Sequence, residues 1–232
     1  MSDAAKTNAS RRAQMLDRIR AGISDGGAAA TRGAVVEARL KSLAPQLIPE
    51  RAKKDAAGRK ALFTEHLKSQ SATVLDVKSD AEIPAAIAGY LRSTNLPMRL
   101  RMGDDARLAG LPWSKEPALT LEKGRAAPAD EVSLSHAVGG VAETGTLVMA
   151  SGADNPVTLN YLPETHVVVV RAKDIAGNYE AAFDAVRAKL GKGTMPRTLN
   201  LISGPSRTGD IGGRLVMGAH GPRRMCVIIV DE

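Results

Sequence analysis

The chain has 232 residues, of which 44% are hydrophobic and 3% aromatic. This length suits one α/β core with an appendage and is too short for two ordinary enzyme domains, and a core with so few rings must be built from aliphatic side chains. The formal charge of +7 comes entirely from residues 1–70, which hold 14 Lys and Arg against 7 Asp and Glu, whereas residues 71–232 hold 18 of each.

Cysteine and histidine usage excludes several kinds of site. An iron–sulfur cluster typically needs four thiolates and a structural zinc site usually needs at least two, but Cys226 is the single cysteine. None of the four histidines has a metal-binding helix spacing, and no GxGxxG or GxxxxGK[ST] loop occurs. We therefore expect no metal and no cofactor on this chain.

The sequence also lacks the features of exported and membrane-spanning chains. The start, MSDAAKTNASRRAQ, has no apolar core of a secretory signal, and no stretch approaches the roughly 18 apolar residues of a membrane span. We expect a cytoplasmic protein.

Residues 1–70 are predicted to form a basic helical arm. Apolar spacing favours helices over Ser10–Ala21 and Glu50–Leu67, and such short amphipathic helices need a surface to pack on. We expect a docking arm that contacts this chain's own core or another subunit, with a merely solvated basic face as the alternative. Nucleic-acid binding is a weaker hypothesis, because Phe63 is the arm's single aromatic and no recognition motif is present.

From residue 71 onward, strand and helix patterns alternate as in an α/β domain. Helices are predicted from Ser79 or Asp80 through Leu91 and over Asn178–Leu190, with a short helical turn after Asn155 and a plain turn at Gly139-Gly140. The predicted strands are Thr73–Val77, Met98–Met102, Ala118–Leu121, Glu131–Ala137, Leu147–Ser151, His166–Val170, Leu199–Ile202 and Met225–Val230.

The segment LISGPSRTGDIGGRLVMGAHGP, residues 201–222, is predicted to face a ligand. A buried strand ends at Gly204-Pro205, and Ser206 or Thr208 is expected to cap a helix whose free N–H groups attract an anion. The candidate binding residues there are Ser203, Gly204, Ser206, Arg207, Thr208 and Asp210.

Roles can be assigned to the charged residues near this segment. Arg207 suits a carboxylate or phosphate, and Asp210 either orients Arg207 or caps the helix. His220 is a candidate acid/base group or a simple turn histidine. Glu143, set in a Thr/Gly-rich turn, is either a general base or nucleophile, or a structural acceptor for Thr144 and Thr146 in a β-bulge.

Three ordered motifs resemble one known family. ISGPSRTGDI with GAHGP and MCVIIVD, VAETGTLVMAS at residues 141–151, and NYLPETHVVVV at residues 160–170 are similar to the motifs of the LUD-domain (lactate-utilisation) family, over roughly residues 70–232. The chain departs from the family pattern at Gly209, where Ala is usual, and at Gly212, where an acidic residue is usual.

The resemblance implies a three-layer α/β/α sandwich of the ribose-5-phosphate isomerase, glucosamine-6-phosphate deaminase and coenzyme A transferase type, spanning residues 71–232. In such a sheet the Glu143 loop and the Ser203 loop would meet at one mouth, which adds Thr144, Gly145 and Thr146 to the candidate binding residues. All of these residues would then contact a small anionic ligand.

The implied function is an accessory or ligand-binding subunit of a multi-protein L-lactate oxidation system whose iron–sulfur clusters lie on partner proteins. A second copy of the chain is a further candidate partner. The alternative is a stand-alone isomerase or acyl- or coenzyme A transferase-like enzyme, acting on a small carboxylate or phosphate through Glu143, Arg207 and His220.

Overall fold

The contacts of the chain divide it into two compact units, residues 1–47 and 48–232. The computed structural model describes residues 3–24, 29–41, 47–191, 193–209 and 212–232. The first unit holds the helices α1 (Asp3–Ser24) and α2 (Ala29–Lys41). Apolar side chains of α1 that share one helix face are between 52% and 66% exposed, namely Met15, Ile19 and Ile23.

A six-stranded parallel sheet forms the centre of the second unit, in the order β1-β12-β7-β4-β2-β3. The apolar run after His166 becomes the buried strand expected of a sheet covered on both faces. The strands are β1 (Thr73–Val77), β2 (Arg99–Met102), β3 (Thr120–Lys123), β4 (Val132–His136), β7 (Thr165–Arg171) and β12 (Arg224–Val230).

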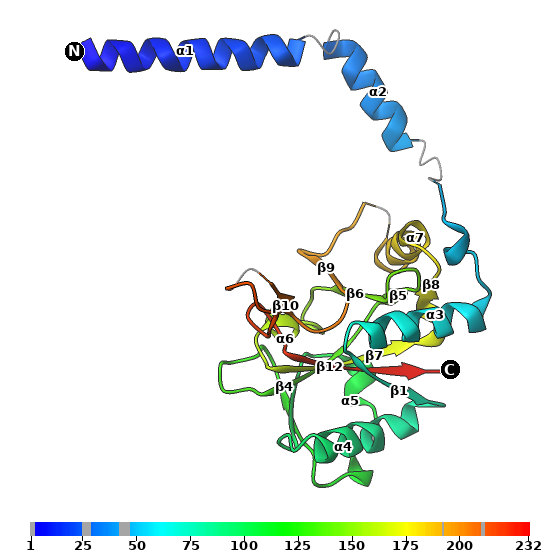
Figure 1. Cartoon of the computed structure of the whole chain (residues 1–232). Coiled ribbons are helices and arrows are strands. Elements are labelled where there is room, and N and C mark those ends of the chain that lie inside the picture. The colour runs from blue at the N-terminus through cyan, green and yellow to red at the C-terminus, as the bar shows by residue number, and fades with distance from the viewer. Residues whose placement is uncertain (1–2, 25–28, 42–46, 192, 210–211) are drawn as a thin grey trace. The chain divides into compact units, whose positions relative to one another are not determined.

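Helices cover both faces of this sheet, which gives the layered α/β arrangement that the sequence predicts. Because successive side chains point to opposite faces, Val167 and Ile228 pack with α4 (Ile83–Ser93), while Val168 and Val227 pack with α3 (Ala56–Ser69). Figure 1 shows α4 and α3 on opposite sides of the strands. Shorter helical segments are α5 (Ala106–Ala109), α6 (Val157–Tyr161), η1 (Glu50–Ala52), η2 (Asp80–Glu82), η3 (Trp113–Lys115) and η4 (Ala172–Asp174).

A second sheet lies beside α3, in the order β8-β5-β6-β9, and α7 (Tyr179–Leu190) packs on it. The predicted turn at Gly139-Gly140 is wrong, because these residues form strand β5 and pair with β6. Leu199–Ile202 is a strand, but it runs antiparallel to β6 and Leu201 is 44% exposed, so the prediction of a buried strand is wrong. The strands are β8 (Ile175–Ala176), β5 (Gly139–Val141), β6 (Thr146–Ala150) and β9 (Leu199–Ile202).

A β-hairpin replaces the helix predicted after Ser206. The strands β10 (Arg207–Thr208) and β11 (Val216–Met217) pair antiparallel. The hairpin closes because the Ser206 N–H donates to the Pro222 carbonyl at 2.8 Å and the Gly218 N–H donates to the Ser206 carbonyl at 2.9 Å. Hence, among the residues that the structure describes on either side of 210–211, Ser206 and Thr208 cap no helix, and no helix N-terminus lies beside them to attract an anion.

The expected arm of residues 1–70 divides between the two units. Phe63 and Leu67 of α3 are fully buried against the central sheet, so α3 belongs to the core of the second unit. A hydrophobic face of this kind is what stabilises a helix too short to persist alone. Within the described ranges, no helix combines the length and apolarity that crossing a bilayer requires.

Candidate functional site

A cluster of four hydroxyl groups connects two of the predicted motifs. The Thr146 hydroxyl lies 2.7 Å from that of Thr144, 2.6 Å from that of Ser203 and 3.0 Å from that of Tyr179. Thr146 is fully buried, so these partners satisfy a hydroxyl that water cannot reach. The loops that carry Thr144 and Ser203 therefore meet, as the sequence analysis predicts.

The end of α3 packs directly against both loops. A Cβ atom at Gly145 would lie 2.6 Å from the Cβ atom of His66, and one at Gly204 would lie 2.9 Å from that of Gln70. Both glycines have positive φ, of 62° and 88°, which side chains rarely adopt. Gln70 also donates from Nε2 to the Thr144 carbonyl at 3.0 Å. The close approach of α3 thus explains why glycine occupies both motif positions.

The Glu143 side chain is 9% exposed and faces Arg51 of η1, whose Nη2 lies 4.0 Å from Oε2. The described contacts of the Thr144 and Thr146 hydroxyls are with each other, Tyr179 and Ser203 rather than with this carboxylate. The structural role considered for Glu143 is to accept hydrogen bonds from Thr144 or Thr146 in a β-bulge. The described contacts of these two hydroxyls do not include such a bond. The part of Glu143 in catalysis stays a prediction.

Ser206 and His220 meet at the base of the hairpin, where the His220 N–H donates to the Ser206 hydroxyl at 3.3 Å. His220 lines a surface pocket of about 360 Å³, and Tyr161 and Glu164 line the same pocket. Burial raises the pKa of Tyr161 above its usual value. The structure therefore brings these two predicted residues together at the base of the hairpin.

The remaining predicted residues of this segment have different surroundings. Arg207 is exposed on β10 and Thr208 is half-buried beside it. Asp210 lies outside the described residues. The roles of these residues in ligand binding stay predictions.

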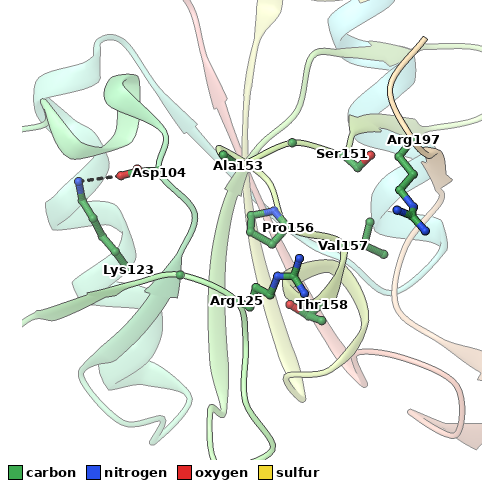
Figure 2. A pocket seen from close by; sticks show the side chains of 11 residues that line it. Asp104, Lys123, Arg125, Ser151, Ala153, Pro156, Val157, Thr158 and Arg197 are labelled. Carbon is green, nitrogen blue, oxygen red and sulfur yellow. Dashed lines mark hydrogen bonds and ion pairs between the residues drawn. The ribbon is translucent and has the colours of Figure 1, made fainter.

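A larger cavity, of about 970 Å³, opens near the carboxyl ends of β2 and β3. Figure 2 shows Lys123 paired with Asp104 on one side, Arg125 near the centre and Arg197 on the opposite side. The Lys123 Nζ atom lies 3.1 Å from Asp104 Oδ1. The cavity lining comprises Asp104, Lys123, Gly124, Arg125, Ser151, Gly152, Ala153, Pro156, Val157, Thr158 and Arg197.

A buried histidine, His136, ends the neighbouring strand β4. Its side chain has both ring nitrogens buried without a hydrogen-bond partner among the described residues. Burial, with a contribution from the Arg107 charge, lowers the pKa of His136 to about 4. The imidazole is therefore neutral at pH 7.

An ion pair on the loop after β2 contributes to the electrostatics around His136. Arg107 donates to both carboxylate oxygens of Asp105, at 2.9 and 2.6 Å. Burial alone would raise the pKa of Asp105, but the hydrogen bonds and charge of Arg107 outweigh it and hold that pKa below its usual value. Asp105 therefore stays ionised.

The sequence patterns did not predict the cavity or the buried His136 beside it. One available signal is position, because Asp104, Lys123 and His136 stand at or directly after the carboxyl ends of predicted strands, where open α/β sheets bind ligands. Arg197 has no such signal, since it reaches the cavity from a segment that precedes β9.

Comparison with known proteins assigns the family. The model of the LUD domain matches residues 60–230, which is well over half of the chain. Lactate utilization protein C of Bacillus subtilis is 36% identical over 93 residues, and that of Shouchella clausii is 33% identical over 92 residues. These matches cover 40% of this chain, and 39% and 40% of the two relatives, so the chain spans less than half of their length.

Two further similarities extend over more of the chain. The uncharacterized protein YkgG of Escherichia coli is 28% identical over 171 residues, which are 73% of this chain and 72% of that protein. A crystal structure of a DUF162 family protein from Deinococcus radiodurans superposes with a TM-score of 0.57 at 23% identity, covering 76% of this chain and 99% of the other. The second similarity concerns the fold alone, whereas the domain match over residues 60–230 identifies the chain as a member of the LUD domain family.

Proposed function

We propose that this chain is a component of a multi-protein, iron–sulfur-dependent L-lactate oxidation system, in which it is an accessory or ligand-binding subunit. The observation that carries the proposal is the LUD domain match over residues 60–230, together with relatives named lactate utilization protein C. The single cysteine supports the view that partner proteins hold the clusters and this chain holds none. We place the system in the cytoplasm.

The ligand we propose is a small anion. The Glu143–Thr146 loop and Ser203 supply hydroxyls and a nearly buried carboxylate, and Arg207 and His220 supply an exposed fork of donors and an imidazole. Under this proposal Glu143 and His220 are the candidate catalytic or ligand-contacting residues.

A second candidate function is a stand-alone isomerase or acyl- or coenzyme A transferase-like enzyme. The parallel central sheet between α3 and α4 favours it, because this layering suits the ribose-5-phosphate isomerase, glucosamine-6-phosphate deaminase and coenzyme A transferase type of sandwich. The nearly buried carboxylate of Glu143 would be its nucleophile or base.

We further propose that the first unit, residues 1–47 of the predicted basic arm, docks on a partner protein or on a second copy of the chain. Exposed apolar side chains on both helices of the first unit support this, because a single face of an isolated helix gains stability only by packing. They are Met15, Ile19, Ile23, Val35, Val36 and Leu40.

The test compares the purified chain, the partner lactate-utilisation proteins, and their mixture in an L-lactate oxidation assay with an artificial electron acceptor. We expect activity in the mixture, and a colourless, inactive chain that contains no stoichiometric iron. Lactate oxidation by the chain alone, or a brown protein with bound iron, would contradict the proposal. Isomerase or acyl-transfer activity of the chain alone, with no effect on the mixture, would favour the second candidate.

A further inference from the structure

We propose that the cavity at the carboxyl ends of β2 and β3 binds a small molecule with at least two anionic groups, held between Arg125 and Arg197. Its volume of about 970 Å³ is within the range of small-molecule sites. The proposal does not depend on the lactate-utilisation assignment.

The charges of the lining favour an anion. The lining contains three cationic side chains, Lys123, Arg125 and Arg197, and one carboxylate, that of Asp104. This carboxylate is already paired with Lys123. In the part of the chain that the structure describes, neither arginine has an ion-pair or hydrogen-bond partner. Each guanidinium can therefore offer its fork of N–H donors to a carboxylate or phosphate group.

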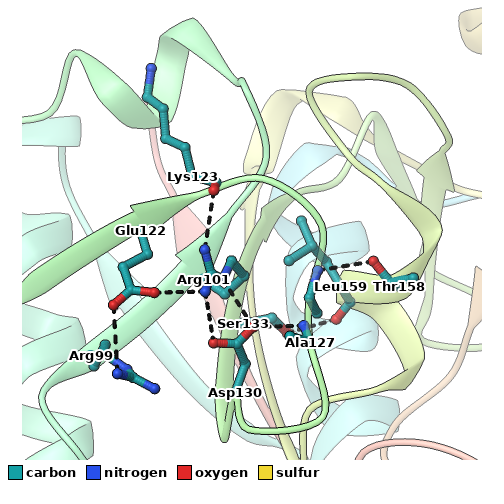
Figure 3. Close-up of polar contacts among 10 residues, drawn as sticks. Arg99, Arg101, Glu122, Lys123, Ala127, Asp130, Ser133, Thr158 and Leu159 are labelled. Carbon is teal, nitrogen blue, oxygen red and sulfur yellow. Dashed lines mark hydrogen bonds and ion pairs between the residues drawn. The ribbon is translucent and has the colours of Figure 1, made fainter.

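The loop that carries Arg125 is held in place from two sides (Figure 3). Arg101 of β2 donates to both carboxylate oxygens of Asp130 at 2.9 and 3.1 Å, and to the Lys123 carbonyl at 3.1 Å. The Ala126 N–H, next to Arg125, donates to the Thr158 hydroxyl of α6 at 3.0 Å. A fixed backbone lowers the conformational cost of presenting the Arg125 side chain to a ligand.

The backbone beside Arg197 is fixed in a similar way. Ser151 and Thr198 exchange two hydrogen bonds, from the Thr198 N–H to the Ser151 hydroxyl at 2.9 Å and from the Ser151 N–H to the Thr198 carbonyl at 3.0 Å. Figure 2 shows Val157 between the guanidinium groups of Arg125 and Arg197, and both arginines line the same cavity. One ligand in this cavity can therefore contact both arginines.

A close backbone contact fixes the loop on the far side of the cavity. The Asp104 N–H donates to the Ala153 carbonyl at 2.9 Å, and a Cβ atom at Gly103 would lie 2.0 Å from the Asp154 carbonyl oxygen. The loop of residues 151–156 thus packs directly against the end of β2, and this close approach requires glycine at position 103.

The sheet topology places one side of the cavity beside a point where parallel sheets bind ligands. From β2 the chain continues to β3 on one side, whereas from β4, the other neighbour of β2, it continues to β7 on the opposite side. Such a reversal opens a crevice at the carboxyl ends of β2 and β4, and the cavity borders that crevice through Asp104, which follows β2. L-Lactate has one carboxylate and would engage one guanidinium group, so two arginines in one cavity fit a polyphosphate or a polycarboxylate better.

The test is calorimetric titration of the full chain with inorganic pyrophosphate and, separately, with citrate, in about 0.15 M salt. The variants are Arg125→Ala, Arg197→Ala and the double substitution. The matched control is Arg187→Ala, which removes an exposed arginine of α7 that pairs with Asp184. A melting curve for each variant establishes that it folds.

We expect saturable binding of at least one probe, and the tighter probe identifies phosphate or carboxylate as the preferred group. Each single Arg→Ala variant should bind roughly 10- to 150-fold more weakly, while Arg187→Ala binds normally. Absence of saturable binding of both probes at millimolar concentration would overturn the proposal, as would unchanged binding by the folded double variant. Either result leaves the lactate-oxidation assay unaffected and therefore does not bear on the proposed function.

Discussion

The corner formed by Glu143–Thr146 and Ser203 differs sharply from the Arg125–Arg197 cavity. The corner is rich in motif residues, yet its hydroxyls bond to one another and its glycine contacts α3. The cavity is lined mainly by segments without a recognised motif, yet it presents two guanidinium groups that bind no protein group within the described residues. A residue pattern that stands out in a sequence can therefore reflect close packing, whereas recognition groups can come from segments without any motif.

Deletion of α3 should produce the largest effect, because the corner and the core both pack against that helix. Removal of residues 1–70 takes away Phe63 and Leu67, each of which contributes about 2–5 kcal/mol to a buried core. We expect this truncation to lose cooperative urea unfolding monitored by circular dichroism.

Removal of residues 1–47 is the matched control, because this segment forms a separate compact unit. The shorter truncation should retain a cooperative transition with a midpoint close to that of the full chain. Cooperative unfolding of the 1–70 truncation at the same midpoint would show that α3 is dispensable and that the corner does not depend on it.

Gly145→Ala tests the packing of the corner itself. The new methyl group would lie 2.6 Å from the His66 Cβ atom at a φ of 62°, and we expect a loss of about 2–4 kcal/mol in the free energy of unfolding. Gly89→Ala in α4, where nothing lies within 4 Å, should instead stabilise by about 0.5–1 kcal/mol. Equal effects of the two substitutions in chemical denaturation would refute the packing argument.

Acid should destabilise the end of the sheet where the cavity lies, through His136. Its folded pKa of about 4 is below the ordinary 6.5, so between these pH values the unfolded chain binds a proton that the folded chain does not. The free energy of unfolding should therefore fall by about 3 kcal/mol as the pH drops from 6.5 to 4. The buried His166, with a pKa of about 3, adds to the fall over the same range and below it.

Urea titrations at several pH values measure this contribution. His136→Gln should show a fall smaller by about 3 kcal/mol, because glutamine does not titrate. An unchanged profile in His136→Gln would mean that the His136 imidazole has water access in solution.

The smallest effect on stability should come from the exposed motif arginine. Arg207→Ala is expected to change the free energy of unfolding by less than about 0.5 kcal/mol, yet to abolish growth on L-lactate as sole carbon source. Arg207→Lys should restore growth in part, because an ammonium keeps the charge without the planar fork. Normal growth of Arg207→Ala would show that the hairpin has a structural role, as the packed loops of Glu143–Thr146 and Ser203 do.

The sequence predicted most strands of the central sheet because local patterns determine them. The alternation around Leu134 and the valine run after His166 are visible without any knowledge of neighbours. The helix predicted after Ser206 failed for a nonlocal reason, since the chain is turned back by hydrogen bonds to Pro222 and Gly218, further along the chain. Residues that cap helices are also common in turns, so Ser206 and Thr208 did not distinguish a helix from a hairpin.

The candidate site was predicted only where the chain carries motifs that resemble those of the family. The sequence correctly predicted that the loops of Thr144 and Ser203 meet, but it gave no sign that Gln70 and Tyr179 would join them. Arg125 and Arg197 are far apart in the chain and line one cavity, where the Thr158 and Ser151 hydroxyls hold the adjoining Ala126 and Thr198. Such a convergence depends on tertiary packing, which periodicity does not encode.

The uneven pairing of the central sheet has a consequence for its motions. β12 and β7 pair over seven register positions, whereas β2 and β4 pair over two, Arg101 with Ser133 and Met102 with Leu134. The β2–β3 edge is thus the part of the sheet with the fewest ladder bonds to its neighbour, and it should open without global unfolding. Its backbone amides should exchange with deuterium before those of β7, and an anion in the adjoining cavity should slow that exchange while leaving β7 unchanged.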